Sequence, residues 1–251
     1  FALSKRPAHI PAWDSLSAVD RQWEADRMEV FAAMVEVMDE NIGRIIAKLK
    51  AKGAWDNTLF LFCADNGACP FERTRGRDLK PWDPKSYWTY DASWAHAGNT
   101  PFRLYKQNQH EGGISSPLIV HWPDEVKARG ELRHAPGHLI DVAPTCLAVA
   151  GLPAEGMEGK SLLPVFAGEK KQDRTLFWEH EGNRAMRDGK WKLVAKGATG
   201  PWELYDIKAD RTELNNLAEK QPKRLKRMAD RWESWAVASL AKPWPWGKKK
   251  K

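Results

Sequence analysis

Two short motifs in the first half of the chain carry residues that could do chemistry together. Asp65-Asn66-Gly67 follows an apolar run, and Lys106 precedes His110-Glu111-Gly112-Gly113 by a few residues. Carboxylate and amide oxygens suit a hard divalent cation, and an ammonium group suits anionic oxygens. Taken alone, Asp65-Asn66-Gly67 is either an ordinary turn or one half of a metal site, and a lone lysine is usually a solvated surface residue.

The elements around these motifs indicate an α/β arrangement. The run 59–64 predicts a strand buried on both faces, as in a parallel sheet whose carboxyl edge binds the ligand. Before it, apolar residues three and four apart predict a long helix over 18–52, with Met34 and Met38 in the core. A second buried strand is predicted over 117–122, and a helix over 139–150.

A smaller antiparallel layer follows. We predict hairpin-connected strands near 175–178, 185–187, 191–194 and 202–205, then an amphipathic helix over 222–237. The sequence therefore divides into an α/β part over 1–164, an antiparallel subdomain over 165–240 and a basic tail over 241–251.

Composition argues against several classes of protein, namely nucleic-acid-binding, disulfide-rich and membrane-spanning proteins. The chain has 251 residues, 42% of them hydrophobic, and a net charge of +7, of which Lys248–Lys251 supply four charges. Because these charges lie in a terminal run and form no basic face, we expect no nucleic-acid partner. Three cysteines argue against a disulfide framework. No apolar stretch approaches the roughly 20 residues of a membrane helix, and no signal peptide opens the chain.

Five motifs in order carry a family resemblance. They are Asp-Asn-Gly at a strand end, then PFRLYKQNQHEGGISSPLIVHWP, HLIDVAPTCLAVAG, MRDGKWKLV and WELYDIKADRTELNNLA. With them the chain resembles the C-terminal half of a type I sulfatase of the alkaline phosphatase superfamily. The resemblance implies a mixed sheet flanked by helices, followed by a smaller antiparallel sheet and helix.

The resemblance also implies roles for single residues. Asp65 and Asn66 match the second pair of ligands to a divalent metal, usually calcium, and Lys106 matches a lysine that binds a sulfate oxygen. His110 either approaches the substrate or caps a loop. The implied substrate is a sulfate monoester of an aryl or carbohydrate compound, and tryptophans in the 67–100 loop could stack on either ring. The resemblance also implies a periplasmic or secreted location.

Other family features do not match this sequence. The nucleophile, a formylglycine made from cysteine in Cys-x-Pro-x-Arg, is expected upstream, because in Cys69-Pro70-Phe71-Glu72-Arg73 the proline follows the cysteine directly. The first pair of metal aspartates is also expected upstream, so we expect residues 1–251 alone to be inactive. The segment around His9 resembles a connector, and we expect His121 and His138 to be structural.

Two alternative functions stay open at this stage. One is hydrolysis of phosphonate or phosphate esters, which occurs in the same superfamily, although there the metal aspartate is usually followed by histidine and here by Asn66. The other is a binding protein that keeps the fold without the nucleophile.

Overall fold

The computed structural model describes residues 2–127, 130–169 and 174–242. It forms two compact units. Unit 1 comprises the described residues of Phe1–Met38, Asn66–Ser116 and Thr175–Lys251, and unit 2 comprises those of Asp39–Asp65 and Pro117–Arg174. The C-terminal sheet therefore belongs to the same unit as the segment that carries Lys106. The boundary predicted at 164 stays a prediction, and most of the basic tail lies outside the described residues.

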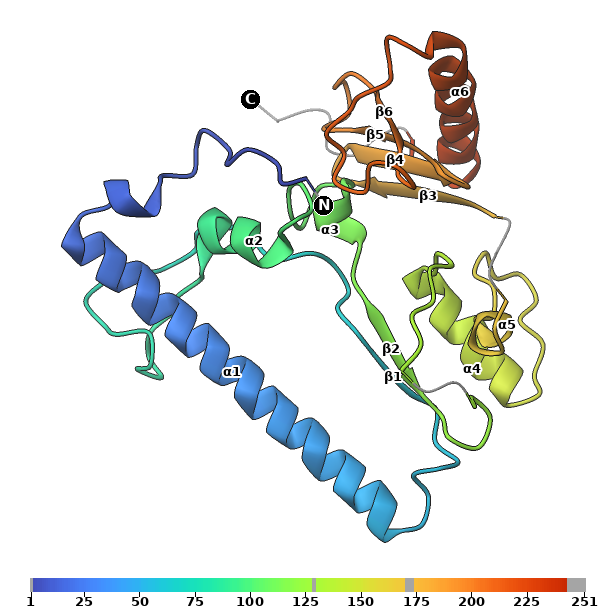
Figure 1. Cartoon of the computed structure of the whole chain (residues 1–251), viewed down its shortest axis with the longest axis horizontal. Coiled ribbons are helices and arrows are strands. Elements are labelled where there is room, and N and C mark those ends of the chain that lie inside the picture. The colour runs from blue at the N-terminus through green and yellow to red at the C-terminus, as the bar shows by residue number, and fades with distance from the viewer. Residues whose placement is uncertain (1, 128–129, 170–173, 243–251) are drawn as a thin grey trace. The chain divides into compact units, whose positions relative to one another are not determined.

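The C-terminal sheet of unit 1 has the predicted strands and helix. Four antiparallel strands follow one another in chain order: β3 (Thr175–His180), β4 (Asn183–Asp188), β5 (Trp191–Ala195) and β6 (Glu203–Asp206). The turn from β3 to β4 uses Glu181 and Gly182, which both have positive φ, the backbone that a two-residue hairpin turn requires. Helix α6 (Pro222–Ala238) lies along one face of this sheet (Figure 1).

Alternation along the strands gives the sheet two different buried faces. One face is apolar: Met186, Leu193 and Leu204 pack against Met228 and Trp232 of α6. Residues one position away point to the opposite face, because successive side chains in a strand alternate. That second face carries Ala185, Val194 and Tyr205. It also carries Lys192, which lies opposite Tyr205 in the ladder and is fully buried.

Unit 2 contains a two-stranded sheet whose pairing differs from our expectation. Strand β1 (Phe60–Cys63) pairs antiparallel with β2 (Leu118–His121). Neither strand is buried on both faces, since Phe62 is 37% exposed and Ile119 56% exposed. The prediction of a parallel, doubly covered strand was therefore wrong for this chain. An apolar run of this length does not distinguish a parallel strand covered on both faces from an antiparallel strand covered on one, because either strand buries at least one face.

The helix that the sequence predicts over 139–150 forms in unit 2 close to its predicted position. A 3-10 turn η2 (Leu139–Asp141) continues into α4 (Val142–Val149), and α5 (Leu163–Phe166) contributes to a small apolar cluster. The imidazole of His138 accepts a hydrogen bond from the backbone of Ile140, so this histidine is structural as predicted. The ring of His121 stacks on that of Trp55, with the two ring centroids 4.4 Å apart.

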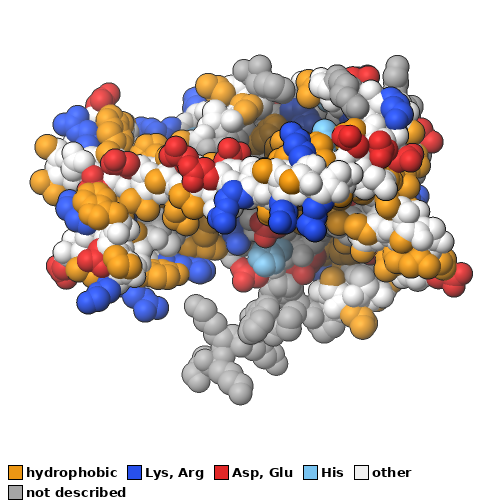
Figure 2. Space-filling view, turned by 90° about the horizontal axis from the view of Figure 1, so that it is seen from below, with side chains coloured by type: hydrophobic (Ala, Val, Ile, Leu, Met, Phe, Trp, Pro, Cys, Tyr) orange, Lys and Arg blue, Asp and Glu red, His pale blue; other side chains and the backbone are white. Residues whose placement is uncertain are grey.

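The long helix α1 (Ala18–Ala51) forms where predicted, but its apolar stripe is not a core. Met34 is 65% exposed and Met38 46% exposed, so the expectation that these methionines are buried was wrong. Apolar residues three and four positions apart define one face of a helix, but they do not show whether another element covers that face. Hydrophobic side chains also lie open on the face of the molecule drawn in Figure 2. Among the described residues, no helix is long and apolar enough to cross a membrane.

Unit 1 also contains three short elements near the candidate site. They are the 3-10 turn η1 (Trp13–Ser15), helix α2 (Asp91–Asn99) and helix α3 (Glu111–Ile114). Helix α2 occupies the end of the stretch that the sequence left without periodicity. Helix α3 contains the two glycines of the His-Glu-Gly-Gly motif.

Candidate functional site

The turn that begins at Asn66 is fixed by close backbone packing. The backbone N–H of Gly67 donates a hydrogen bond to the carbonyl of Gly113 at 2.9 Å. A Cβ atom at Gly67 would lie 1.8 Å from the carbonyl oxygen of Gly112, so no larger residue fits here without moving the backbone. The glycines of the two motifs thus meet, and this contact sets the path of the chain just after Asn66.

Lys106 lies beside this turn. Its backbone N–H donates to the carbonyl of Ala68 at 3.0 Å. Asn99, the last residue of α2, joins the two segments: its side-chain oxygen accepts from the N–H of Ala68, and its side-chain nitrogen donates to the carbonyls of Leu104 and Gly112. The structure therefore brings together two motifs that are about forty positions apart in the sequence.

The Lys106 side chain is available for a ligand. The residue is half-buried, and within the described part of the chain its ammonium group makes no hydrogen bond or ion pair.

Asp65 and Asn66 fit part of a hard-cation site. They are consecutive, one exposed and one half-buried, and they offer carboxylate and amide oxygens. Calcium takes six to eight oxygen ligands, so two side chains cannot form a whole site. Within the described ranges there is no group of three or more His, Cys, Asp or Glu residues that could hold a metal ion. The donor chemistry fits the predicted metal, and further ligands are required.

His110 is deeply buried, at 1% exposure, and directed toward the C-terminal sheet. Its Nε2 lies 3.4 Å from a carboxylate oxygen of Glu203 on β6. The imidazole makes no capping hydrogen bond to α3, although the residue occupies the N-cap position. Its contact with substrate stays a prediction.

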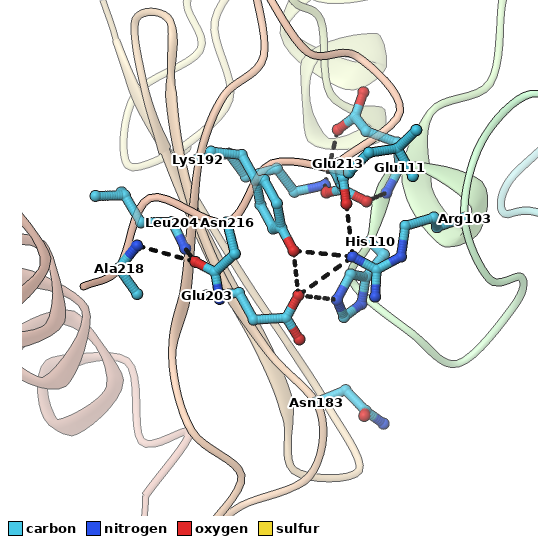
Figure 3. Close-up of polar contacts among 12 residues, drawn as sticks. Arg103, His110, Glu111, Asn183, Lys192, Glu203, Leu204, Glu213, Asn216 and Ala218 are labelled. Atoms are coloured by element: carbon cyan, nitrogen blue, oxygen red, sulfur yellow. Dashed lines mark hydrogen bonds and ion pairs between the residues drawn. The ribbon is translucent and has the colours of Figure 1, made fainter. Parts of the chain in front are cut away.

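A charge cluster holds the segment around Lys106 against the sheet (Figure 3). The ammonium of Lys192 lies 2.7 Å from Glu111 and 2.8 Å from Glu213, and all three residues are buried. Burial alone would raise the pKa of Glu111, but the positive charges of Lys192 and Arg211 outweigh it and lower that pKa. Glu111 therefore stays ionised inside the protein, as its partners require.

A second group of contacts lies beside the first. Arg103 donates to the hydroxyl of Tyr205 at 2.8 Å and to the backbone carbonyl of Glu213 at 2.7 Å. Tyr205 in turn donates to Glu203. Burial would raise the pKa of Glu203, but hydrogen bonds from His110 and Tyr205 and the charge of Arg103 lower it to about 2.

Sequence reasoning did not find this network. Strand alternation places Lys192 and Val194 on the same face, but nothing local shows that this face is buried. The partners of Lys192 come from positions 111 and 213, far away in the sequence. Contacts of this range have no local signature.

His9 lies closer to the candidate site than we expected from its connector-like sequence. Its Nε2 is 3.1 Å from the hydroxyl of Tyr105, the residue next to Lys106. Burial and the charge of His9 lower the pKa of His96 on α2. The segment Pro7-Ala8-His9-Ile10-Pro11 gives no local sign of this approach, because His9 and Tyr105 are 96 positions apart.

Cys69 plays a structural part in the turn. Its backbone N–H donates to the hydroxyl of Tyr90 at 3.1 Å, which ties the start of the 67–100 stretch to its end. The residue is half-buried and its thiol is free.

Comparisons with known proteins consistently find sulfatases. A sulfatase family profile matches residues 8–152, and the profile described as N-sulphoglucosamine sulphohydrolase, C-terminal, matches residues 102–234. An uncharacterised sulfatase of Schizosaccharomyces pombe is 34% identical over 88% of this chain and 45% of its own length. An arylsulfatase of Klebsiella aerogenes is 30% identical over 61% of this chain and 36% of its own length. The chain thus spans less than half the length of these relatives.

Solved structures agree with the sequence relatives. The crystal structure of Ps i-CgsB in complex with k-i-k-neocarrahexaose has a TM-score of 0.67 and 26% identity, covering 84% of this chain and 43% of that one. The mixed arrangement of helices and antiparallel strands described above is therefore shared with a solved protein over most of this chain.

Gly67→Ala should disrupt the turn. The added methyl group meets a backbone carbonyl that no rotamer change can move, so the free energy of unfolding should fall by about 1–3 kcal/mol. Urea unfolding measures this directly. Gly98→Ala is the matched control, because a Cβ there meets nothing within 4 Å. Equal stability of the two variants would show that the glycine contact does not constrain the turn.

Glu203 should make stability depend on pH in the acid range. Its pKa is lowered from 4.5 to about 2, so its contribution is complete above about pH 5 and is lost as pH falls toward 2. Between pH 6 and pH 3 the wild type should lose about 2 kcal/mol more unfolding free energy than Glu203→Gln, at 1.36 kcal/mol per pKa unit. Urea titrations at both pH values measure the difference. Parallel losses in the two proteins would contradict the assignment.

Proposed function

Because the chain belongs to the sulfatase family, we propose that it carries the substrate-binding half of a site that hydrolyses a sulfate monoester to an alcohol or phenol and inorganic sulfate. The observation that carries the proposal is the backbone contact between Lys106 and Ala68. It brings the backbone of Lys106 next to the turn that begins at Asn66. An anion and its counter-cation can be held side by side by this arrangement.

In this proposal Asp65 and Asn66 bind a divalent cation, most suitably calcium, because both offer hard oxygen donors. When bound, the cation would neutralise charge on the sulfate and hold it against its nucleophile. Asp65 supplies the anionic ligand and Asn66 a neutral one. The glycine contact behind Asn66 limits how far its amide can shift, which favours one cation position.

Lys106 then acts on the sulfate itself. Its ammonium group donates to sulfate oxygens, and charge on those oxygens and on the ester oxygen increases as the S–O bond breaks. His9 is placed to help, since it contacts Tyr105 on the adjacent position of the same segment. An imidazole there can donate to a sulfate oxygen or to the leaving oxygen.

The nucleophile in this proposal is a formylglycine, supplied by a Cys-x-Pro-x-Arg motif. No such motif occurs in residues 1–251. Cys69 does not replace it, because its proline spacing differs and its backbone is part of the turn.

We infer that the substrate is an aryl or carbohydrate sulfate. Relatives are named arylsulfatase and N-acetylgalactosamine-6-sulfatase, and one structural neighbour is a complex with a neocarrahexaose. Among the loop tryptophans of 67–100, Trp88 packs against Trp23 in a tilted arrangement and Trp94 packs edge-on against Trp13. Trp82 is 59% exposed, so of the three it has the most ring surface open to a substrate.

Asp65→Ala should weaken calcium binding more than Asn66→Ala, because it removes a charged ligand and not a neutral one. The loss should exceed about tenfold, the lower end of what even an outer-shell change costs. Calorimetric titration of calcium into the full-length protein measures it without relying on activity. Asp78→Ala, an exposed aspartate, is the control. Unchanged affinity in Asp65→Ala would leave Asp65-Asn66-Gly67 as a turn only.

Lys106→Ala should lower kcat and kcat/KM for an aryl sulfate together, by on the order of a hundredfold or more, in line with the loss of one oxyanion donor. Its Tm should change little, because Lys106 makes no ion pair in the described part of the chain. Lys106→Arg should restore little activity, since a planar fork does not replace a compact ammonium. Steady-state kinetics with Lys85→Ala as the control test this, and a normal kcat would remove Lys106 from the site.

A further inference from the structure

The segment that carries Lys106 is tied to the C-terminal sheet on both sides of the lysine. Three positions before it, Arg103 reaches the hydroxyl of Tyr205 and the backbone carbonyl of Glu213. Four positions after it, His110 meets Glu203. The next residue, Glu111, is bound by Lys192. The lysine therefore sits on a short span whose ends are both held by side chains of, or next to, strands β5 and β6.

The second tie is made of buried charges. Lys192 is enclosed by Glu111 and Glu213, and the backbone N–H of Glu111 also donates to Glu213 at 2.9 Å. Arg211 completes the set by contacting Glu111 at 2.9 Å and the hydroxyl of Ser115 at 2.7 Å. The carboxylates of Glu111 and Glu213 thus meet the cations of Lys192 and Arg211.

Such a cluster is a poor way to gain stability alone. Taking charges out of water costs several kcal/mol per ion, and an apolar core of the same shape is often as stable or more so. What charge pairs add is a defined geometry, since each hydrogen bond fixes both a distance and a direction. The opposite face of the same sheet shows the apolar alternative, with Leu193 and Leu204 packed on α6.

We propose that the C-terminal sheet positions the Lys106 ammonium for sulfate, with Lys192 and Tyr205 as positioning residues. This inference rests on the proposed function. In this inference the charged face of the sheet has a role in the reaction, and its effect reaches Lys106 through the backbone of residues 103–111. Lys192 and Tyr205 themselves do not touch the substrate. The apolar face has no such connection, because its partners lie in α6.

Tyr205 offers the sharpest place to test this. Its hydroxyl accepts from Arg103 and donates to Glu203, while its ring packs with Ala185 and Val194. Burial raises the pKa of the hydroxyl, and Glu203 raises it further, so the hydroxyl remains protonated and able to donate. Tyr205→Phe removes both hydrogen bonds and keeps the ring.

The neighbouring residue gives a matched control. Leu204 lies on the same strand but points to the apolar face, so Leu204→Val lowers the packing against α6 and leaves the charged face intact. Both variants should be assayed in the full-length protein with 4-nitrophenyl sulfate, at a temperature well below either Tm. We expect kcat/KM to fall about tenfold or more in Tyr205→Phe, because small misplacements of a catalytic group are costly. It should stay within about twofold of wild type in Leu204→Val, even where Tm falls equally.

A double variant separates positioning from general loosening. If Tyr205 acts through Lys106, then Tyr205→Phe should cost nothing further in a Lys106→Ala background, since the group to be positioned is gone. A loss that persists at full size in that background would overturn the proposal. So would wild-type kinetics in Tyr205→Phe, or activity that follows Tm in both single variants.

Hydrogen exchange makes the test independent of catalysis. Backbone amides of residues 104–109 should exchange faster in Tyr205→Phe than in wild type, and at the wild-type rate in Leu204→Val. If the wild-type protein hydrolyses no sulfate ester, the proposed function fails, and exchange alone then decides whether the sheet holds this segment. Unchanged exchange in Tyr205→Phe would refute the positioning role in either case.

Discussion

The buried ammonium of Lys192, held between Glu111 and Glu213, is the interaction on which the arrangement of unit 1 depends. It joins three parts of the chain that are distant in sequence: the His-Glu-Gly-Gly motif, strand β5 and the stretch after β6. Removing one partner would leave an uncompensated buried charge, which is among the most costly changes a protein interior can undergo. The three segments are therefore constrained to meet in one way.

This long-range constraint works together with a local one. The glycines at 67, 112 and 113 let backbones approach so closely that a Cβ atom at any of them would clash with a carbonyl group. The charges determine which segments meet, and the glycines determine how near they come. The backbone positions of Asn66 and Lys106 are constrained in this way, because each residue lies one or two positions from such a contact.

Much of this could be predicted from the sequence, for physical reasons that differ between elements. The hairpins of the C-terminal sheet were predictable because alternation and turn residues such as Gly182 and Gly189 are local signals. Helix α1 was also predictable. The exposure of Met34 was not, because an apolar stripe on a helix does not show whether another element covers it. The pairing of β1 with β2 depends on residues about sixty positions apart. The charge network and the approach of His9 to Tyr105 have the same long-range character.

The central proposal is that this chain carries the substrate-binding half of a site for sulfate esters, and the most direct measurement compares two substrates with the same leaving group. The full-length protein should be assayed with 4-nitrophenyl sulfate and with a 4-nitrophenyl phosphonate monoester under identical conditions with calcium present. We expect a higher kcat/KM for the sulfate, because Asn66 follows the proposed metal ligand Asp65 at the position where the phosphonate hydrolases of the superfamily are expected to have histidine. A preference for the phosphonate, or turnover of neither ester, would contradict it.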